Sequence, residues 1–143
     1  MPTGTPNSLQ RLRKHADYQR VYTASRKQFA KQITFFFSLR PPDRRSDTPG
    51  ARIGLTVGKV LGHAVERNRI KRRLRELIRR HAVLLGSYPV DVILHPRRTV
   101  LEMEAARLER EVVQVFQTIR KVLDRDAMQA VQPAEAAPPS ATP

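Results

Sequence analysis

The sequence has no cysteine, few acidic residues and no long apolar run. Without cysteine the chain can form neither a disulfide nor a zinc–thiolate site. No stretch approaches the ~20 apolar residues that a transmembrane helix needs. The first residues also lack the apolar region of a secretory signal. We therefore expect a soluble protein that acts in the cytoplasm and contacts no membrane.

The scarcity of acids also bears on catalysis. A protein nuclease needs clustered carboxylates for metal ions, or a histidine pair for acid–base chemistry. The acidic residues of the first two thirds of the chain form no such cluster: Asp17, Asp43, Asp47, Glu66, Glu76 and Asp91. The four histidines are likewise separated in the sequence: His15, His63, His81 and His95. There is no glycine-rich phosphate loop. These residues favour a binding protein with no catalytic side chain and no small-molecule substrate, and they leave any metal site unknown.

Positive charge is what the chain has in abundance. It holds 27 Lys and Arg against 13 Asp and Glu, a net charge of +14. Most of the excess lies in the first two thirds, in a chain whose length suits one domain. A surface of this kind is typical of proteins that bind a polyanion.

The densest basic segment is 62–81, where eight of twenty residues are Arg or Lys and two are Glu. Its residues divide into an apolar stripe and an opposite polar stripe at helical spacing: Ile70, Leu74, Leu77 and Ile78 against Asn68, Arg72, Arg75 and Arg79. The alternative is an ordinary solvated face, but such faces mix charges of both signs. The excess of one sign favours a nucleic-acid ligand.

A strand precedes this helix, since Ile53, Leu55 and Val57 alternate within 52–59. The helix then opens with Ala64-Val65-x-Arg67-Asn68-Arg69-x-Lys71-Arg72. This strand, turn and helix resemble the bacterial ribonuclease P protein component, and the likeness extends more loosely over residues 9–125. One departure is that the family usually has two Lys in the turn, whereas here Lys59 is followed by Val60.

The resemblance implies an α+β fold of two layers. It predicts a sheet of about four strands, two long helices, a short N-terminal helix and a left-handed β-α-β crossover, against the usual right-handed rule. It also implies a role as the RNA-binding subunit of ribonuclease P. In that ribonucleoprotein endoribonuclease, a hydrolase, the catalytic RNA removes the 5′ leader from precursor tRNA. The Mg²⁺ ions that the reaction uses are held mainly by the RNA.

Two groups of binding residues follow from the same likeness. The first, together with Arg75 of the polar stripe, would bind ribonuclease P RNA: Lys59, Arg67, Asn68, Arg69, Lys71, Arg72 and Arg75. The second would bind the leader of precursor tRNA: Tyr18, Val21, Tyr22, Thr34 and Phe36. The residues alone leave open whether the tyrosines stack on bases or pack in the core. The family usually has Phe at these helix positions, so the tyrosines keep a stacking surface and add hydroxyls.

The remaining pattern completes the expected domain at 9–125. Phe36 lies on the opposite side of a strand at 31–39 from Ile33, Phe35, Phe37 and Leu39, which we expect to lie in the core. We expect a helix at 15–22 capped by Asp17, a strand at 52–58 antiparallel to 31–39, a central strand at 90–95 and a helix at 103–125. A fourth strand would lie in 26–30 or in the segment ending at 61. Residues 1–8 and 126–143 are predicted to be disordered.

Two other classes of function stay open from the sequence. One is a ribonuclease that works without RNA. The other is a basic RNA- or DNA-binding protein without catalytic activity, including a sequence-specific DNA reader. A DNA reader presents short or amide side chains to base edges. Asn68 is the sole amide among many cations, which favours recognition of phosphates and shape.

Overall fold

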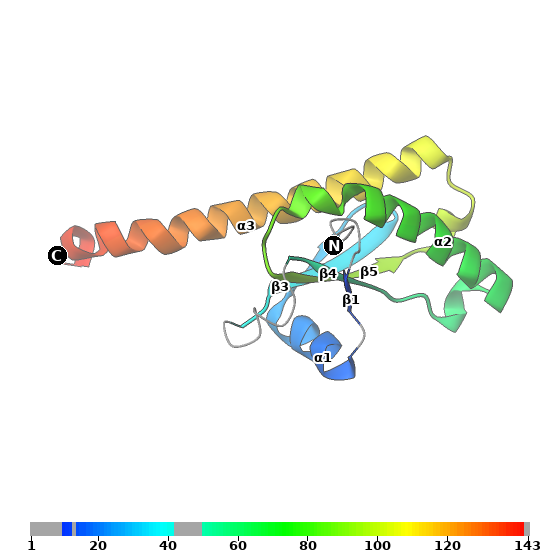
Figure 1. Ribbon diagram of the computed structural model, residues 1–143, viewed down its shortest axis with the longest axis horizontal. Coiled ribbons are helices and arrows are strands. Elements are labelled where there is room, and N and C mark those ends of the chain that lie inside the picture. Colours follow the sequence, from blue (N-terminus) through cyan, green and yellow to red (C-terminus); the bar gives the residue numbers. More distant parts are fainter. Residues whose placement is uncertain (1–9, 13, 42–49, 142–143) are drawn as a thin grey trace, which may run out of the picture.

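The computed structural model describes residues 10–12, 14–41 and 50–141, so the predicted disordered segment 1–8 lies outside the described residues. The described part of the chain folds into an α+β arrangement in which three helices lie on a mixed sheet (Figure 1). They are β1 (Gln10–Arg11), α1 (His15–Ala24), β2 (Arg26–Phe29), β3 (Ile33–Leu39), β4 (Arg52–Leu55), α2 (Ala64–His81), β5 (Val90–Pro96) and α3 (Ala105–Ala141). Short 3₁₀ turns are η3 (Lys59–Leu61), η4 (Ala82–Leu85) and η5 (Arg98–Leu101).

The strands form one mixed sheet in the order β1-β4-β5-β3-β2. β5 is the central strand, antiparallel to β3 and parallel to β4. The prediction that 52–58 pairs antiparallel with 31–39 was therefore wrong, because β5 lies between them. The reason is burial: β5 is the most continuously apolar strand, and a central position covers both of its faces. The left-handedness of the β4-α2-β5 crossover remains a prediction.

The fourth strand is β2, which pairs antiparallel with β3. The alternative segment ending at residue 61 instead forms the turn η3. A further strand, β1, pairs parallel with β4 through Gln10 and Arg11 and was not predicted. Two residues are too short to show an alternating pattern, so only the pairing with β4 defines β1 as a strand.

Helices cover the two faces of the sheet unequally. α2 and α3 lie on one face, and α1 lies on the other (Figure 1). The main core fills the α2–α3 side and includes the predicted stripe of α2 and the predicted core face of β3: Ile70, Leu74, Leu77, Ile78, Ile33, Phe35 and Phe37. On the α1 side a smaller buried cluster joins Leu12, Val21 and Ile93. Tyr18, Tyr22 and Phe36 on this face are only partly buried.

The helix α3 is longer than its apolar pattern predicts. Among its side chains that the structure describes, which run to residue 129, the last buried one is Leu123, close to the expected end at 125. The helical backbone continues to Ala141 and projects beyond the rest of the molecule (Figure 1). Residues 142 and 143 lie outside the described residues, and the disorder expected for 126–143 stays a prediction. The alanines of this segment favour a helix, whereas Pro133, Pro138 and Pro139 oppose one.

Candidate nucleic-acid interface

The N-terminus of α2 is fixed by interactions around Glu66. The Glu66 carboxylate accepts a hydrogen bond from the His63 backbone N–H at 2.8 Å, which lowers the pKa of Glu66. Arg98 pairs with Glu66 at 3.1 Å and also donates to the Leu61 carbonyl at 3.0 Å. The turn that carries Lys59 is therefore tied to the start of the helix. Lys59 and Val60 are exposed, and Val60, at 89% exposure, occupies the position of the family's usual second Lys.

The predicted RNA-binding residues share the turn and one side of α2. Their side chains are exposed or half-buried: Lys59, Arg67, Asn68, Arg69, Lys71, Arg72 and Arg75. Within the described part of the chain, none of these cations forms an ion pair with a carboxylate. Their charges are thus available to an external anion. Arg79, also on the predicted polar stripe, pairs instead with Glu76 at 2.7 Å.

One arginine of the basic segment has a structural role that the sequence does not show. Arg73 donates hydrogen bonds to the backbone carbonyls of Val100 and Leu101, at 2.6 and 3.0 Å, and to that of Met103. It therefore closes the loop between β5 and α3. The apolar spacing places Arg73 beside the buried stripe of α2, and this is the signal from which such a role could be suspected.

Arg75 connects the basic face to the other side of the molecule. Partial burial lowers its pKa, the nearby Arg11 lowers it further, and the Tyr18 hydroxyl raises it. Burial raises the pKa of Tyr18, Tyr22 raises it further, and the nearby Arg75 partly offsets the rise. Arg75 and Arg11 therefore lie near the part of α1 where the predicted leader-binding residues begin.

An aromatic cluster lies where α1 meets the sheet. The Tyr22 ring meets the Phe36 ring edge-on, with centroids 5.0 Å apart and planes at 88°. The Tyr22 hydroxyl is 2.8 Å from His95 Nε2, and the His95 ring lies 5.3 Å from that of Phe36. All three side chains are half-buried. Their rings form an aromatic surface that also contains the polar contact between Tyr22 and His95. His95 was not predicted here, because only strand pairing brings it beside Tyr22.

Tyr18 extends this surface over β4. A Cβ atom at Gly54 would meet the Tyr18 hydroxyl and lie 2.8 Å from its Cζ, so the tyrosine rests directly on the glycine backbone. The rings of Tyr18 and Tyr22 are 6.4 Å apart. Thr34 lies on the same face and pairs with His95 in the sheet. Four of the five predicted leader-binding residues are therefore neighbours with some exposure.

Val21, the fifth, has a different place. It is fully buried between α1 and the sheet, in contact with Leu12 and Ile93. A buried side chain cannot touch a leader nucleotide, so its role is to hold α1 against the sheet. In the predicted pattern an aromatic residue is followed by two other residues, a valine and a second aromatic residue, and this spacing does place the three side chains on one helical face. The valine lies at the edge of that face nearest the sheet.

A buried ion network anchors α1 below this surface. Asp91 of β5 accepts hydrogen bonds from Arg40 at 2.7 Å, from Arg52 at 2.7 and 2.8 Å, and from Arg20 of α1 at 2.8 Å. Asp17 pairs with Arg20 at 2.8 Å and with Arg52 at 3.4 Å. Asp17 was predicted to cap the helix, which was wrong. The helix begins earlier, at His15, and Asp17 points into the sheet to bind these arginines.

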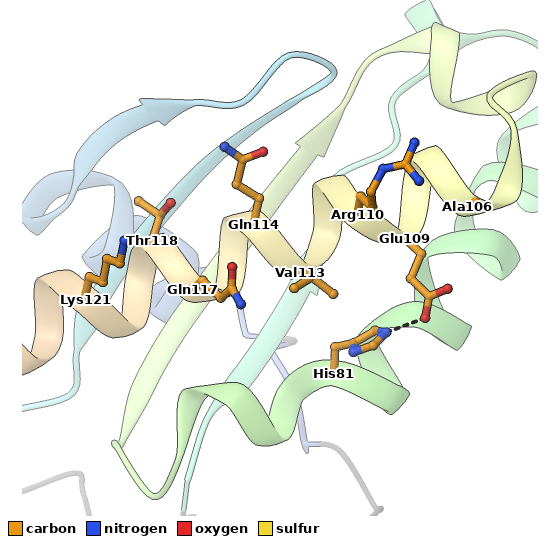
Figure 2. Close-up of a pocket in the computed structure, with 9 residues that line it drawn as sticks. All are labelled: His81, Ala106, Glu109, Arg110, Val113, Gln114, Gln117, Thr118 and Lys121. Atoms are coloured by element: carbon orange, nitrogen blue, oxygen red, sulfur yellow. Dashed lines mark hydrogen bonds and ion pairs between the residues drawn. The ribbon is translucent and has the colours of Figure 1, made fainter.

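A concave region lies on α3, away from the aromatic cluster. It is a groove of about 760 Å³ lined by His81 of α2 and by side chains of α3: Ala106, Glu109, Arg110, Val113, Gln114, Gln117, Thr118 and Lys121 (Figure 2). His81 Nε2 and the Glu109 carboxylate lie 2.6 Å apart, and this contact lowers the pKa of Glu109. The pair joins α2 to α3, which gives His81 a structural role.

The described residues contain neither a metal-binding group nor a membrane-spanning helix. In residues 10–12, 14–41 and 50–141, no group of three or more His, Asp and Glu side chains is arranged to hold a metal ion. Within the same ranges, no helix combines the length and apolar character needed to cross a membrane.

Comparisons with known proteins agree with this geometry. The family model described as Ribonuclease P matches residues 7–120. The ribonuclease P protein component of Levilactobacillus brevis is 33% identical over 117 residues, covering 81% of this chain and 92% of the relative. That of Syntrophus aciditrophicus is 39% identical over 108 residues, covering 76% and 85%.

Solved structures give the same result. The RNase P protein of Staphylococcus aureus superposes with a TM-score of 0.65 at 26% identity, covering 79% of this chain and 97% of that one. The RNase P protein of Thermotoga maritima shares the fold, with a TM-score of 0.64 at 18% identity over 76% of this chain and 96% of that one. With the family model matching most of the chain and the basic helix and aromatic cluster in place, the chain belongs to the ribonuclease P protein family.

Proposed function

We propose that this RNA-binding subunit of ribonuclease P uses its two surfaces for two RNA ligands, and that it contributes no catalytic side chain. The cations of α2 and its preceding turn bind the catalytic RNA, and the aromatic cluster binds the 5′ leader of precursor tRNA. The chemistry then belongs to the RNA, which also holds the Mg²⁺ ions, in the cytoplasm. The observation that carries the proposal is that the cations of α2 and its turn have no described carboxylate partner, while Tyr22 and Phe36 form a half-buried aromatic cluster on the other face of the sheet.

The form of each surface supports its assignment. Cations along a helix, without described carboxylate partners, suit the phosphates of a folded RNA, which proteins read mainly by shape and backbone. Half-exposed aromatic rings suit unpaired bases, because every base has a face that can stack. The leader of precursor tRNA is single-stranded, whereas mature tRNA lacks it. The aromatic cluster therefore lets the enzyme bind precursor tRNA, which has a leader, in preference to mature tRNA, which has none.

Cleavage of precursor tRNA tests this division of labour. The protein alone should give no cleavage, because no acid–base or metal constellation is found among the described residues. A bacterial ribonuclease P RNA at low Mg²⁺ should cleave slowly alone and efficiently with the protein added, because the protein neutralises phosphates that otherwise require more Mg²⁺. Robust cleavage by pure protein without RNA would refute the proposal and favour an RNA-independent ribonuclease.

The leader assignment predicts a separation between binding and stability. Phe36 is half-buried on the ligand side, whereas Phe35 is 2% exposed in the main core. Phe36→Ala should weaken binding of precursor tRNA to the assembled enzyme by ~1–3 kcal/mol and spare mature tRNA. Phe35→Ala should instead cost about 3–5 kcal/mol of folding stability. Equal destabilisation by the two variants in urea unfolding would contradict the assignment, as would equal loss of affinity for both RNAs.

A further inference from the structure

The exposed side chain of Phe29 lies on the sheet face that carries the aromatic cluster. Residues paired directly across neighbouring antiparallel strands point to the same side. Phe29 pairs with Thr34, and Thr34 pairs with His95. These three form one row across β2, β3 and β5, next to the row of Phe36 and Ile93. Phe29 is two strand spacings, about 10 Å, from His95.

The helix α1 reaches this row at its β5 end, through the contact of Tyr22 with His95, while Phe29 lies at the β2 end of the row. Its Arg20 binds Asp91, and its Val21 packs on Ile93. The ring of its Tyr22 contacts the rings of Phe36 and His95 edge-on. Phe29, at the far end of β2 from α1, is 67% exposed. Single exposed apolar residues are common on proteins, but this ring continues an aromatic surface.

Two cations border the same end of the sheet. Lys31 lies in the turn between β2 and β3 and is exposed. The backbone N–H of Arg97 donates to the Gln32 carbonyl at 2.9 Å, which places the exposed Arg97 beside that turn. An aromatic ring with cations beside it is the combination that binds single-stranded nucleic acid, because the ring stacks on a base while the cations contact the backbone.

We propose that Phe29, Lys31 and Arg97 form a distal subsite for single-stranded RNA, which binds leader nucleotides farther from the cleavage site than those at Tyr22 and Phe36. Phe29 supplies the stacking surface, and Lys31 and Arg97 bind the phosphates on either side. The inference rests on the proposed leader function of the aromatic cluster, and it extends that path to the edge strand of the sheet.

A leader-length series tests the subsite. The assembled enzyme is titrated with precursor tRNAs whose leaders are shortened one nucleotide at a time from about ten to none. With the wild-type protein, affinity should rise over the inner nucleotides and again over the outer ones. Phe29→Ala should remove the second rise, lowering affinity for the longest leader by about 5- to 100-fold. Its affinity for the shortest leaders and for mature tRNA should stay unchanged.

The controls separate this inference from the proposed function. Val83→Ala removes another exposed apolar side chain, 77% exposed on η4, and should follow the wild-type curve. Phe29→Trp should keep the second rise, because a larger ring stacks as well. The double change Lys31→Ala and Arg97→Ala should make the affinity for precursor tRNAs with long leaders depend less on salt. The salt dependence of the affinity for short leaders should stay unchanged.

Each outcome has a defined meaning. If Phe36→Ala abolishes the leader effect while Phe29→Ala follows the wild-type curve at every length, the distal subsite is refuted and the leader cluster stands. If the wild-type enzyme binds all leader lengths equally, the proposed function and the subsite fail together. Since Phe29 is largely exposed, its variant should retain the wild-type unfolding midpoint, which circular dichroism measures.

Discussion

Asp91→Asn is expected to be among the most destabilising single changes in the protein, at about 3–5 kcal/mol of unfolding free energy. Asp91 is completely buried and accepts hydrogen bonds from Arg20, Arg40 and Arg52. The amide has nearly the same size, but it removes the negative charge and turns one acceptor into a donor facing guanidinium groups. Arg40, which is also buried, then loses the negative charge of Asp91 beside its guanidinium group. Since a typical domain is stable by only 5–15 kcal/mol, such a loss is large.

Urea unfolding at neutral pH measures this effect. Glu76→Gln is the matched control, because Glu76 forms exposed ion pairs with Arg79 and Arg80. This substitution should lower the unfolding free energy by at most about 1 kcal/mol. Asp91→Asn should also weaken leader binding, because the Arg20 contact holds α1 over the sheet. A change in stability no greater than that of Glu76→Gln would show that the network contributes nothing net. In that case the packing of Val21 alone anchors α1.

Binding to ribonuclease P RNA should depend steeply on salt. The predicted interface contains six cations, and each neutralised phosphate releases counterions. The slope of log K against log salt should therefore be about −4 to −5, and the affinity should fall roughly 300- to 1,000-fold between about 50 and 200 mM salt. Filter binding or fluorescence anisotropy across a salt series measures the slope. A slope near zero would refute the phosphate-binding role of this helix.

The double change Arg69→Ala and Arg72→Ala locates the effect on α2. Both side chains are exposed, so their loss should leave the fold intact while the slope decreases in magnitude by about 2. Lys121→Ala with Arg125→Ala removes the same charge from exposed positions on α3 and should leave the slope unchanged. If the two double variants weaken binding equally, general positive charge, and not the α2 surface, would account for the affinity.

The sequence by itself determined which side chains of each segment pack in the core. The apolar stripe of α2 and the two sides of β3 follow from residue periodicity, and the described burial confirms both except at Leu39, which is exposed at the end of β3. Periodicity is reliable here because each pattern is set within a single helix or strand. The family likeness then placed the two groups of binding residues, and the fold and family it implied are confirmed. The roles of the individual binding residues stay predictions until the experiments above are done.

Only the tertiary structure decided how these segments meet. The neighbours of β4, the buried partners of Asp91 and the position of His95 beside Tyr22 join residues far apart in the chain. No local pattern encodes such pairs, because strand order depends on how α2 crosses the sheet. The same reason applies to Arg73, one cation among eight in its segment, which donates hydrogen bonds to backbone carbonyls. Composition fixed the amount of charge, and packing decided which charges form contacts within the protein.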